Sequence, residues 1–280
     1  MKQINRSPLS YVSRIVRIVF LTFMAAISLF PFLWMLLSSL KTNDILFNFP
    51  IEWFPKDPQW DNYRRVWDGT SFLRAYGNTF FVATVATAGM VTTSLFAAYS
   101  FSKLRYKGRD VLFLMYLSVL MIPWHAIMVP QFIIMKKLNL MNSLWGLVLL
   151  HSFNPFGVFL LRQFFLGIPG ELSEAARIDG CSDLRILWGM IVPLSKAAIA
   201  SLVIFSFLGE WNDYLGPLIY LSNEKLNTIQ LALKNFQSLF SMDYVLTFAG
   251  TVCSLVPIVA LYVFCQKYFT EGIAFSGLKG

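Results

Sequence analysis

The chain has 280 residues, of which 56% are hydrophobic and 14% are charged. A soluble domain usually carries about 25% charged residues, so the composition excludes an ordinary soluble protein. The apolar residues form long runs, and about 20 in a row suit a helix that crosses the roughly 30 Å apolar core of a bilayer. The net charge of +8 fits contact with anionic lipid. We expect an integral membrane protein that contacts membrane lipid and binds no nucleic acid, because the sequence holds no basic aromatic platform or reading module.

The chain begins with basic residues followed by an apolar run, as a signal peptide does. The run continues to about Leu40 without a small-residue cleavage site, so we expect a retained first span. The three cysteines, at 181, 253 and 265, are scattered. They predict neither a disulfide framework nor a metal cluster.

Six segments are apolar enough over a window of about 19 residues to cross a membrane. They cover residues 16–40, 75–101, 111–135, 143–165, 197–221 and 244–266. We expect an all-α fold of six transmembrane helices in one domain over residues 1–280, with a loop at 166–196 and a tail at 267–280.

Small residues and prolines predict how individual spans pack. The second span holds Gly77, Gly89 and Ser94, and small residues let helices approach closely, so we expect it to pack on protein. Prolines 123 and 130 in the third span and Pro217 in the fifth should bend or break their helices.

Lys and Arg are unevenly distributed between the two sides of the membrane. With six spans both ends lie on one side, and that side, with Arg162 included, holds 14 of the 23 basic residues. The bias is sharpest in short segments, where the positive-inside rule is most reliable. We expect both termini and the 166–196 loop to be cytoplasmic.

That loop contains the charged stretch "ELSEAARIDGCSDLRILWGMIVPL", residues 171–194. Its acids at 171 and 174 suit the first turn of a helix, and Gly180 can end that helix in a left-handed conformation. Ser182 or Asp183 can cap a second helix. In that helix one apolar face is expected from Leu184, Leu187, Trp188 and Ile191. The pattern predicts a helix–glycine–helix along the membrane surface, which by itself could be an amphipathic connector that only anchors the loop.

The residues "EAARIDG" and, later, "IVPL" resemble the EAA loop of the permease subunits of binding-protein-dependent ABC importers. The matching positions are Glu174, Ala175, Ala176, Gly180, Ile191 and Pro193, while Cys181 and Val192 depart mildly from the pattern. The resemblance implies that residues 171–182 form a coupling helix that docks on a separate ATPase subunit. The coupling residues it implies are Glu171, Glu174, Ala175, Ala176, Asp179 and Gly180.

Further stretches, among them "GEWNDYLGPLIYLS" and "QKYFTEGIAFSGLKG", resemble the carbohydrate branch of this family, the six-span maltose-type permease. There the C-terminal tail reaches toward the ATPase dimer, which implies contacts from Gly277, Lys279 and Gly280. By composition alone the tail would be a flexible polar end. The resemblance further implies three partners: an ABC ATPase dimer, a second homologous permease and an extracytoplasmic sugar-binding protein. It places the chain in a bacterial or archaeal cytoplasmic membrane as a multi-pass protein.

No G-x-x-x-x-G-K-[ST] phosphate loop occurs in the sequence. We therefore expect a transport subunit that is not an enzyme and has no cofactor of its own, with ATP and Mg²⁺ bound by the partner ATPase. An importer for another solute remains an alternative. An ATP-independent secondary transporter is a second one, although such proteins usually show internal repeats or a set of ion-coupling carboxylates.

Glu210 and Asp213 are the clear pair of acids within the expected spans. A carboxylate at the bilayer centre costs about 2.5–3.5 kcal/mol unless it faces water or a partner. Together with Asn212 these acids are expected to line or brace the translocation path beside a break at residues 216–217. The alternative is a structural hydrogen-bond cluster that holds the break. The histidines at 125 and 151 are expected to be packed or pore-facing polar residues rather than ligands.

Overall fold

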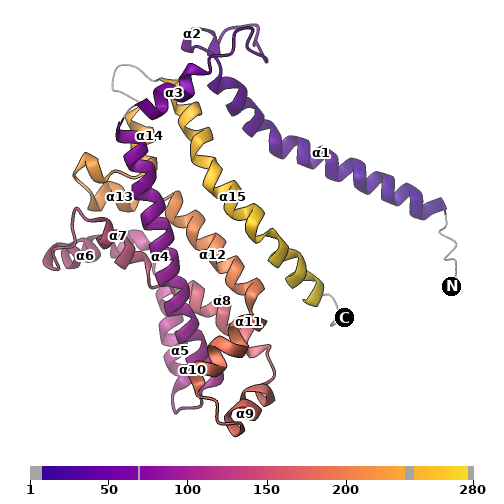
Figure 1. The fold of residues 1–280 in the computed structure, drawn as a ribbon, viewed down its shortest axis with the longest axis vertical. Coiled ribbons are helices and arrows are strands. Elements are labelled where there is room, and N and C mark those ends of the chain that lie inside the picture. Colours follow the sequence, from indigo (N-terminus) through magenta and orange to yellow (C-terminus); the bar gives the residue numbers. More distant parts are fainter. Residues whose placement is uncertain (1–7, 69, 237–242, 277–280) are drawn as a thin grey trace. The chain divides into compact units, whose positions relative to one another are not determined.

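The computed structural model describes residues 8–68, 70–236 and 243–276, which form helices joined by loops (Figure 1). The chain divides into two compact units. Unit 1 contains residues 1–68 and 235–253, and unit 2 contains residues 69–234 and 254–280.

Unit 1 begins with a long apolar helix and continues with short ones. Its elements are α1 (Pro8–Ser39), α2 (Asn43–Leu46), α3 (Asp61–Asp68) and the first residues of α15 (Tyr244–Ser276). Asn62 of α3 donates hydrogen bonds to the backbone oxygens of Ser39 (2.9 Å) and Lys41 (3.0 Å), which fixes α3 to the end of α1. Asp243 accepts a hydrogen bond from Leu246 N (3.0 Å) and so closes the first turn of α15.

Unit 2 is organised around α4 (Thr70–Lys103), a continuous helix of 34 residues. Three further helices pack against it: α7 (Leu144–His151), α8 (Pro155–Leu166) and α12 (Lys196–Trp211) (Figure 1). A Cβ added at Gly89 would come within 2.5 Å of Ser152 Oγ, so α4 and the end of α7 touch closely there. A Cβ at Gly157 of α8 would likewise come within 2.5 Å of Ser94 Oγ of α4. The expected packing of the second span against protein is confirmed.

Among the described residues, three single helices are long and apolar enough to cross a membrane. They are Ser13–Ser39, Ser71–Lys103 and Tyr244–Lys267. Three bent pairs raise the number to as many as six, judged by length and composition. These pairs are Arg109–Met121 with Trp124–Lys137 (bent by 100°), Leu144–His151 with Pro155–Leu166 (40°) and Asp183–Leu194 with Lys196–Trp211 (83°).

The first bend follows the expected effect of proline. Helix α5 (Arg109–Ser118) and the turn η1 (Val119–Met121) end before Pro123, and α6 (Trp124–Lys137) begins directly after it. Pro130, in contrast, stays inside α6. The expectation of a break or bend is therefore met at Pro123, whereas Pro130 is accommodated within a helix.

The fifth expected span, 197–221, is not one continuous helix. Helix α12 ends at Trp211, and a separate short helix, α13 (Leu215–Tyr220), follows. The break lies at residues 212–214, earlier than expected, because Asp213 Oδ1 accepts a hydrogen bond from Gly216 N (3.1 Å) and starts a new helix there. Before α12, the chain runs through α10 (Asp183–Ile186), the π-helix η2 (Leu187–Ile191) and α11 (Val192–Leu194).

The chain between α13 and unit 1 returns along α4. It contains η3 (Glu224–Leu226) and α14 (Ile229–Asn235). Asn78 of α4 donates hydrogen bonds to the backbone oxygens of Lys225 and Asn227, both at 3.0 Å. This segment therefore closes the end of unit 2 opposite the α4–α5 loop, the end to which α13 also belongs.

Candidate functional site

Helix α9 (Gly170–Ile178) lies in the stretch that resembles the EAA loop. Gly180 follows it with φ +79°. Gly180 N donates to Arg177 O (3.0 Å) and Cys181 N donates to Ala176 O (2.9 Å). These two bonds are those of a Schellman motif, which ends a helix with a left-handed glycine. The predicted helix ending in glycine is confirmed.

The two faces of α9 differ in exposure. Ser173 and Ala176 are buried, and Ala176 packs with the apolar core that includes Phe165 and Leu187. The exposed face carries most of the other residues implied in coupling: Glu171, Glu174, Ala175 and Asp179. Ile178 is 86% exposed on the same helix. Ala176 thus supports the position of α9 from inside, while its neighbours are open to a partner.

The second helix of the loop begins as expected. Ser182 Oγ accepts a hydrogen bond from Arg185 N (3.4 Å), so Ser182, rather than Asp183, is the cap. Asp183 Oδ1 instead accepts hydrogen bonds from Tyr99 of α4 and Arg177 of α9, both at 2.9 Å. The hydrogen bond to Asp183 raises the pKa of Arg177 above its ordinary value. One carboxylate therefore joins α4, α9 and α10.

The apolar face expected for this second helix is partly wrong. Leu187 and Ile191 are buried, but Leu184 is 61% exposed and Trp188 is 50% exposed, while Ile186 is buried. The cause is the π-helix η2, whose hydrogen bonds run from i to i+5 rather than i to i+4. In this wider turn Ile186 and Ile191 both lie on the buried side of the segment. In an α-helix of constant period, Leu184 and Trp188 would have lain on the same side as Ile191.

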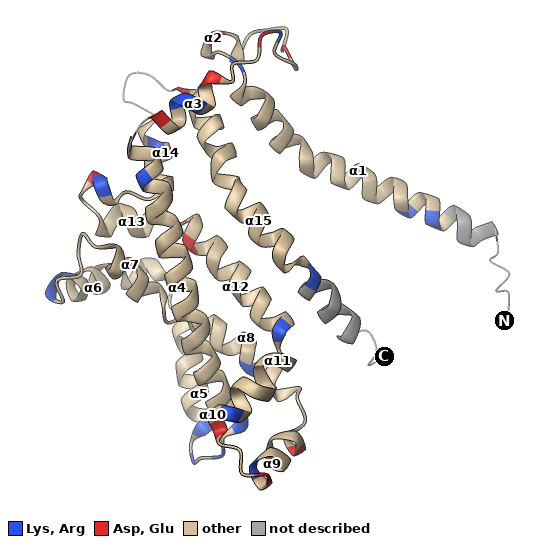
Figure 2. Cartoon of the chain, in the orientation of Figure 1, with Lys and Arg blue, Asp and Glu red and all other residues tan. Residues whose placement is uncertain are grey.

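Basic residues gather at the end of unit 2 that carries α9, α10 and the α4–α5 loop (Figure 2). Several bind neighbouring elements. Arg162 of α8 donates to Phe101 O (3.0 Å) and pairs with Asp110 (3.0 Å). Lys103 Nζ donates to Ile168 O (2.6 Å). The end of α4 and the start of α5 are therefore fastened to α8 and to the connection between α8 and α9.

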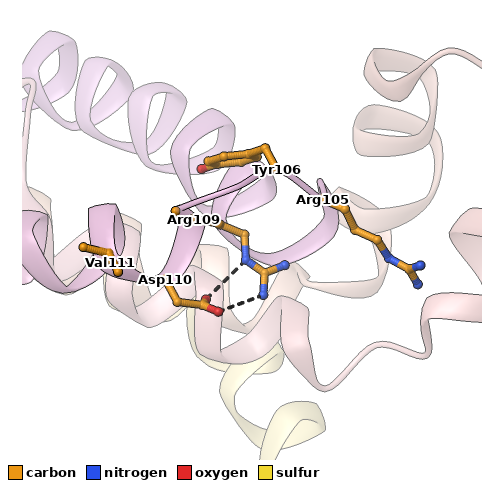
Figure 3. A pocket seen from close by; sticks show the side chains of 6 residues that line it. Arg105, Tyr106, Arg109, Asp110 and Val111 are labelled. Atoms are coloured by element: carbon orange, nitrogen blue, oxygen red, sulfur yellow. Dashed lines mark hydrogen bonds and ion pairs between the residues drawn. The ribbon is translucent and has the colours of Figure 1, made fainter.

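The α4–α5 loop itself contains a pocket of about 400 Å³. Figure 3 shows the guanidinium of Arg109 turned toward the carboxylate of Asp110, while the side chain of Arg105 points away from that pair. Arg109 Nε lies 3.2 Å from Asp110 Oδ1, and Arg105 Nη2 lies 2.9 Å from Oε1 of Glu174 in α9. The loop thus links α9 to the start of α5.

A second group of polar residues lies at the end of α12. His151 Nδ1 is hydrogen-bonded to Glu210 Oε2, and His151 Nε2 lies 3.8 Å from Asp213 Oδ2. The side chain of Glu210 is 7% exposed, whereas those of His151 and Asp213 are 25% and 21% exposed. We refer to Glu210, Asp213 and His151 as the carboxylate cluster. Its two acids share one imidazole as their partner.

The carboxylate cluster borders a pocket of about 480 Å³. The lining includes His151, Asn212 and Asp213 together with two aromatic side chains, Trp124 and Tyr214. Asn212 accepts a hydrogen bond from Gln230 (3.3 Å). Of the three residues expected at the translocation path, Asn212 and Asp213 line this pocket, and Glu210 is buried behind His151.

His151 was expected only as a packed or pore-facing polar residue, and its part in this cluster was not predicted from the sequence. It lies 59 residues before Glu210 and ends α7, one half of a bent pair whose break the sequence analysis did not anticipate. Pro155 at the start of α8 and Asn154, whose side chain accepts from Phe156 N (2.8 Å), were the local signals of that break. Nothing local signals the pairing with Glu210. The tail residues Gly277, Lys279 and Gly280 lie outside the described residues.

Comparison with known proteins is consistent with these features. The family model "Binding-protein-dependent transport system inner membrane component" matches residues 90–274. The arabinooligosaccharides transport system permease protein AraQ of Bacillus subtilis is 31% identical and covers 99% of this chain and 100% of its own length. The sulfoquinovosyl glycerol transport system permease protein SmoH of Agrobacterium fabrum is 34% identical, over 90% of this chain and 89% of its own.

The fold is also similar to a solved structure. In the crystal structure of a bacterial ABC transporter involved in the import of the acidic polysaccharide alginate, one chain has a TM-score of 0.83 and 27% identity. The match covers 94% of this chain and 99% of that one. The range matched by the family model, residues 90–274, includes most of unit 2 and the EAA-like stretch at residues 171–194. The chain belongs to the family of binding-protein-dependent transport system inner membrane components, the permease subunits of ABC transporters.

Proposed function

We propose that this chain is the transmembrane subunit of an ATP-driven importer of sugars or oligosaccharides. The single observation that carries the proposal is the geometry of α9, a short helix closed by the Gly180 Schellman motif with its acidic face exposed. The substrate class is supported by the relatives, whose names refer to arabinooligosaccharides, galactooligosaccharides and sulfoquinovosyl glycerol.

The exposed face of α9 docks on a separate ATPase subunit. Glu171, Glu174, Ala175 and Asp179 would contact that subunit, which binds ATP and Mg²⁺, while Ala176 and Gly180 hold α9 in position. Movement of the ATPase dimer would be transmitted through Asp183, because this carboxylate connects α9 and α10 to α4. The chain thus has a mechanical role and no reaction of its own.

The pocket beside the carboxylate cluster lines the translocation path. Its carboxylate and amide oxygens, from Asp213 and Asn212, can accept hydrogen bonds from hydroxyl groups, and Trp124 and Tyr214 offer flat apolar surfaces. This combination suits sugar rings, which have polar edges and apolar faces. Glu210, buried behind His151, holds this imidazole in place at the wall of the pocket.

A second, homologous permease completes the path. A groove of about 640 Å³ runs along α4, α12 and the part of α15 in unit 2. Thr84, Ala88 and Thr92 of α4 line it. Such small side chains let another helix approach closely in a membrane, which supports this face as the contact with the partner permease.

Both termini and the α4–α5 loop are cytoplasmic in this proposal. The support is the gathering of Lys and Arg at one end of unit 2 (Figure 2). Reporter fusions at Lys107 and Ala176 should report the cytoplasm, and a fusion at Trp60 should report the outside. The reverse pattern would overturn the orientation.

The test of function is purification of the tagged chain at native expression in mild detergent, followed by mass spectrometry. The expected result is one second permease and two ATPase copies for each copy of this chain. Recovery of the chain alone, or with copies of itself, would contradict the proposal and favour a transporter that works without an ATPase. Uptake assays with a panel of labelled oligosaccharides and other solutes then test the substrate class.

The docking face can be tested by cross-linking in a cysteine-free background. Ile178→Cys, at a position 86% exposed on α9, should cross-link to the ATPase. Trp60→Cys, at a position 68% exposed and assigned to the other side, is the matched control and should not. Equal cross-linking from both positions would contradict the assignment of α9.

A further inference from the structure

A further pocket lies beside the first turn of α9. It has a volume of about 210 Å³ and is lined by residues of the α4–α5 loop, the α8–α9 connection and α9. Its charged lining residues are Lys103, Arg105, Arg109, Arg177 and Glu174. Four cations and one carboxylate around one pocket favour an anionic ligand.

The beginning of α9 adds donors to this pocket. The helix has nine residues, and Gly170, its first residue, lines the pocket. The residue before it is Pro169, whose side chain has no hydrogen-bond acceptor. The first N–H groups of a helix lack partners within the helix and carry a partial positive charge, so they bind anions.

Ser173 is an independent sign of a ligand. It lines the same pocket and is 2% exposed, and its Oγ has no hydrogen-bond partner within the described part of the chain. Buried hydroxyl groups are nearly always hydrogen-bonded, so an unpaired one calls for an explanation. Six other buried side-chain atoms share this property, but Ser173 combines it with a lining of basic side chains.

The basic residues differ in how far they are already neutralised. Arg105 pairs with Glu174, Arg109 with Asp110 and Arg177 with Asp183. Lys103 forms no ion pair within 4.0 Å among the described residues and donates to the backbone oxygen of Ile168, and the carboxylate of Glu171 in the first turn of α9 interacts with it only electrostatically. Its ammonium group carries three hydrogens, and two of them remain for a ligand.

The position of the pocket indicates where such an anion comes from. Lys103 is the last residue of the apolar helix Ser71–Lys103, and Arg109 is the first residue of the apolar segment Arg109–Met121. Both therefore lie where membrane-crossing segments end and lipid headgroups begin. Phosphate is a group with several acceptor oxygens that suits Lys, Arg, hydroxyl and helix N–H donors together.

We propose that this pocket binds a phosphate group, supplied by the headgroup of an anionic phospholipid. Lys103 and the first turn of α9 hold the phosphate oxygens, and Ser173 Oγ donates to one of them. Because the site touches α9, an anionic lipid would steady the helix that we assign to ATPase docking. The site does not depend on the identity of the transported solute.

The experiment uses the intact transport complex in nanodiscs of phosphatidylcholine with or without phosphatidylglycerol. Native mass spectrometry counts the phosphatidylglycerol molecules that stay bound. Lys103→Gln should reduce retention about tenfold, the effect of losing one hydrogen bond to a charged group. Lys107→Gln, at an exposed position of the same loop that does not line the pocket, removes the same charge and should leave retention unchanged.

Ser173→Ala is a second variant that keeps helix propensity high and should reduce retention without a change of charge. A parallel arm titrates inorganic phosphate into complexes in phosphatidylcholine alone. Binding of phosphate that depends on Lys103, without retention of phosphatidylglycerol, would keep the phosphate site but overturn the lipid as its source. Equal losses in Lys103→Gln and Lys107→Gln would indicate diffuse surface charge and overturn the site, as would a complex that binds neither probe.

Discussion

The EAA-like loop and the carboxylate cluster are both polar regions of unit 2, yet they are built in different ways. The helix ends of the loop are set by bonds between residues close in sequence, such as Gly180 N to Arg177 O and Arg177 to Asp183, and the attachment of the loop to α4 uses a distant residue, Tyr99. The carboxylate cluster depends on contact between Glu210 and His151, which are 59 residues apart. Local backbone geometry therefore sets the helix ends of the EAA-like loop, whereas burial of partnered polar groups determines the carboxylate cluster.

The largest effect is expected from Glu210→Gln. Glu210 is buried and its hydrogen-bond partner is His151, and leaving a buried donor or acceptor without its partner costs about 1–3 kcal/mol, more where a charged group is involved. The free energy of unfolding in detergent should fall accordingly, and a cycle with His151→Gln should show strong coupling between the two sites. Glu224→Gln, at an exposed position, is the control. Equal effects at positions 210 and 224 would remove the distinction between the two regions.

Gly180→Val tests the loop. Gly180 has φ +79°, and a left-handed conformation costs a residue with a Cβ about 1–2 kcal/mol, more when it is β-branched. We expect the chain to insert normally but to lose the ATPase on purification, with uptake reduced at least to a tenth. Gly189→Val is the matched control, because Gly189 lies within η2 and a Cβ there meets no described atom within 4 Å. Normal uptake by Gly180→Val would contradict the coupling role of α9.

Asp213 allows its structural and path-lining roles to be separated. Asp213→Asn keeps the side-chain oxygen that accepts from Gly216 N, so stability should hardly change. Asp213→Ala removes it and should cost about 1 kcal/mol. If Asp213 lines the path, uptake falls in both variants. Unchanged affinity and rate in normally expressed Asp213→Asn would remove the path-lining role and leave a structural cluster.

The smallest effect is expected from Arg105→Gln. The pair of Arg105 and Glu174 is exposed, with side-chain exposures of 88% and 55%, and such pairs contribute about 0–1 kcal/mol at most. Unfolding measurements in phosphatidylcholine nanodiscs should show a change near the detection limit that disappears at high salt. A large, salt-independent loss would mean that the loop, like the carboxylate cluster, depends on long-range pairing.

The same contrast explains what the sequence could predict. Hydropathy located the apolar segments, and Gly180 and Ser182 marked helix ends, because each signal is complete within a few residues. The π-helix η2 was not predicted, since an apolar pattern read with a period of 3.6 residues cannot reveal a turn of a different width. The pairing of His151 with Glu210 was not predicted either, because it arises only when α7 and α12 both pack against α4.

The limits of the broken spans were predicted only in part. Pro123 marked its break correctly, but the break after Trp211 depends on Asp213, which captures Gly216 N and starts α13 before Pro217 is reached. Asp213 can serve either as a charge in the path or as an acceptor for a backbone N–H. The sequence does not indicate which of these two roles its carboxylate takes.

The continuous course of α4 also has a consequence for how the chain can change in length. Insertion of a single residue into the middle of its 34 would rotate every later side chain by about 100°. The faces that meet α7, α8 and α12 would then no longer match. An extra residue at 122–123, 152–154 or 212–214 would only lengthen an existing break. Insertions and deletions among permeases of this kind should therefore collect at the breaks and spare α4.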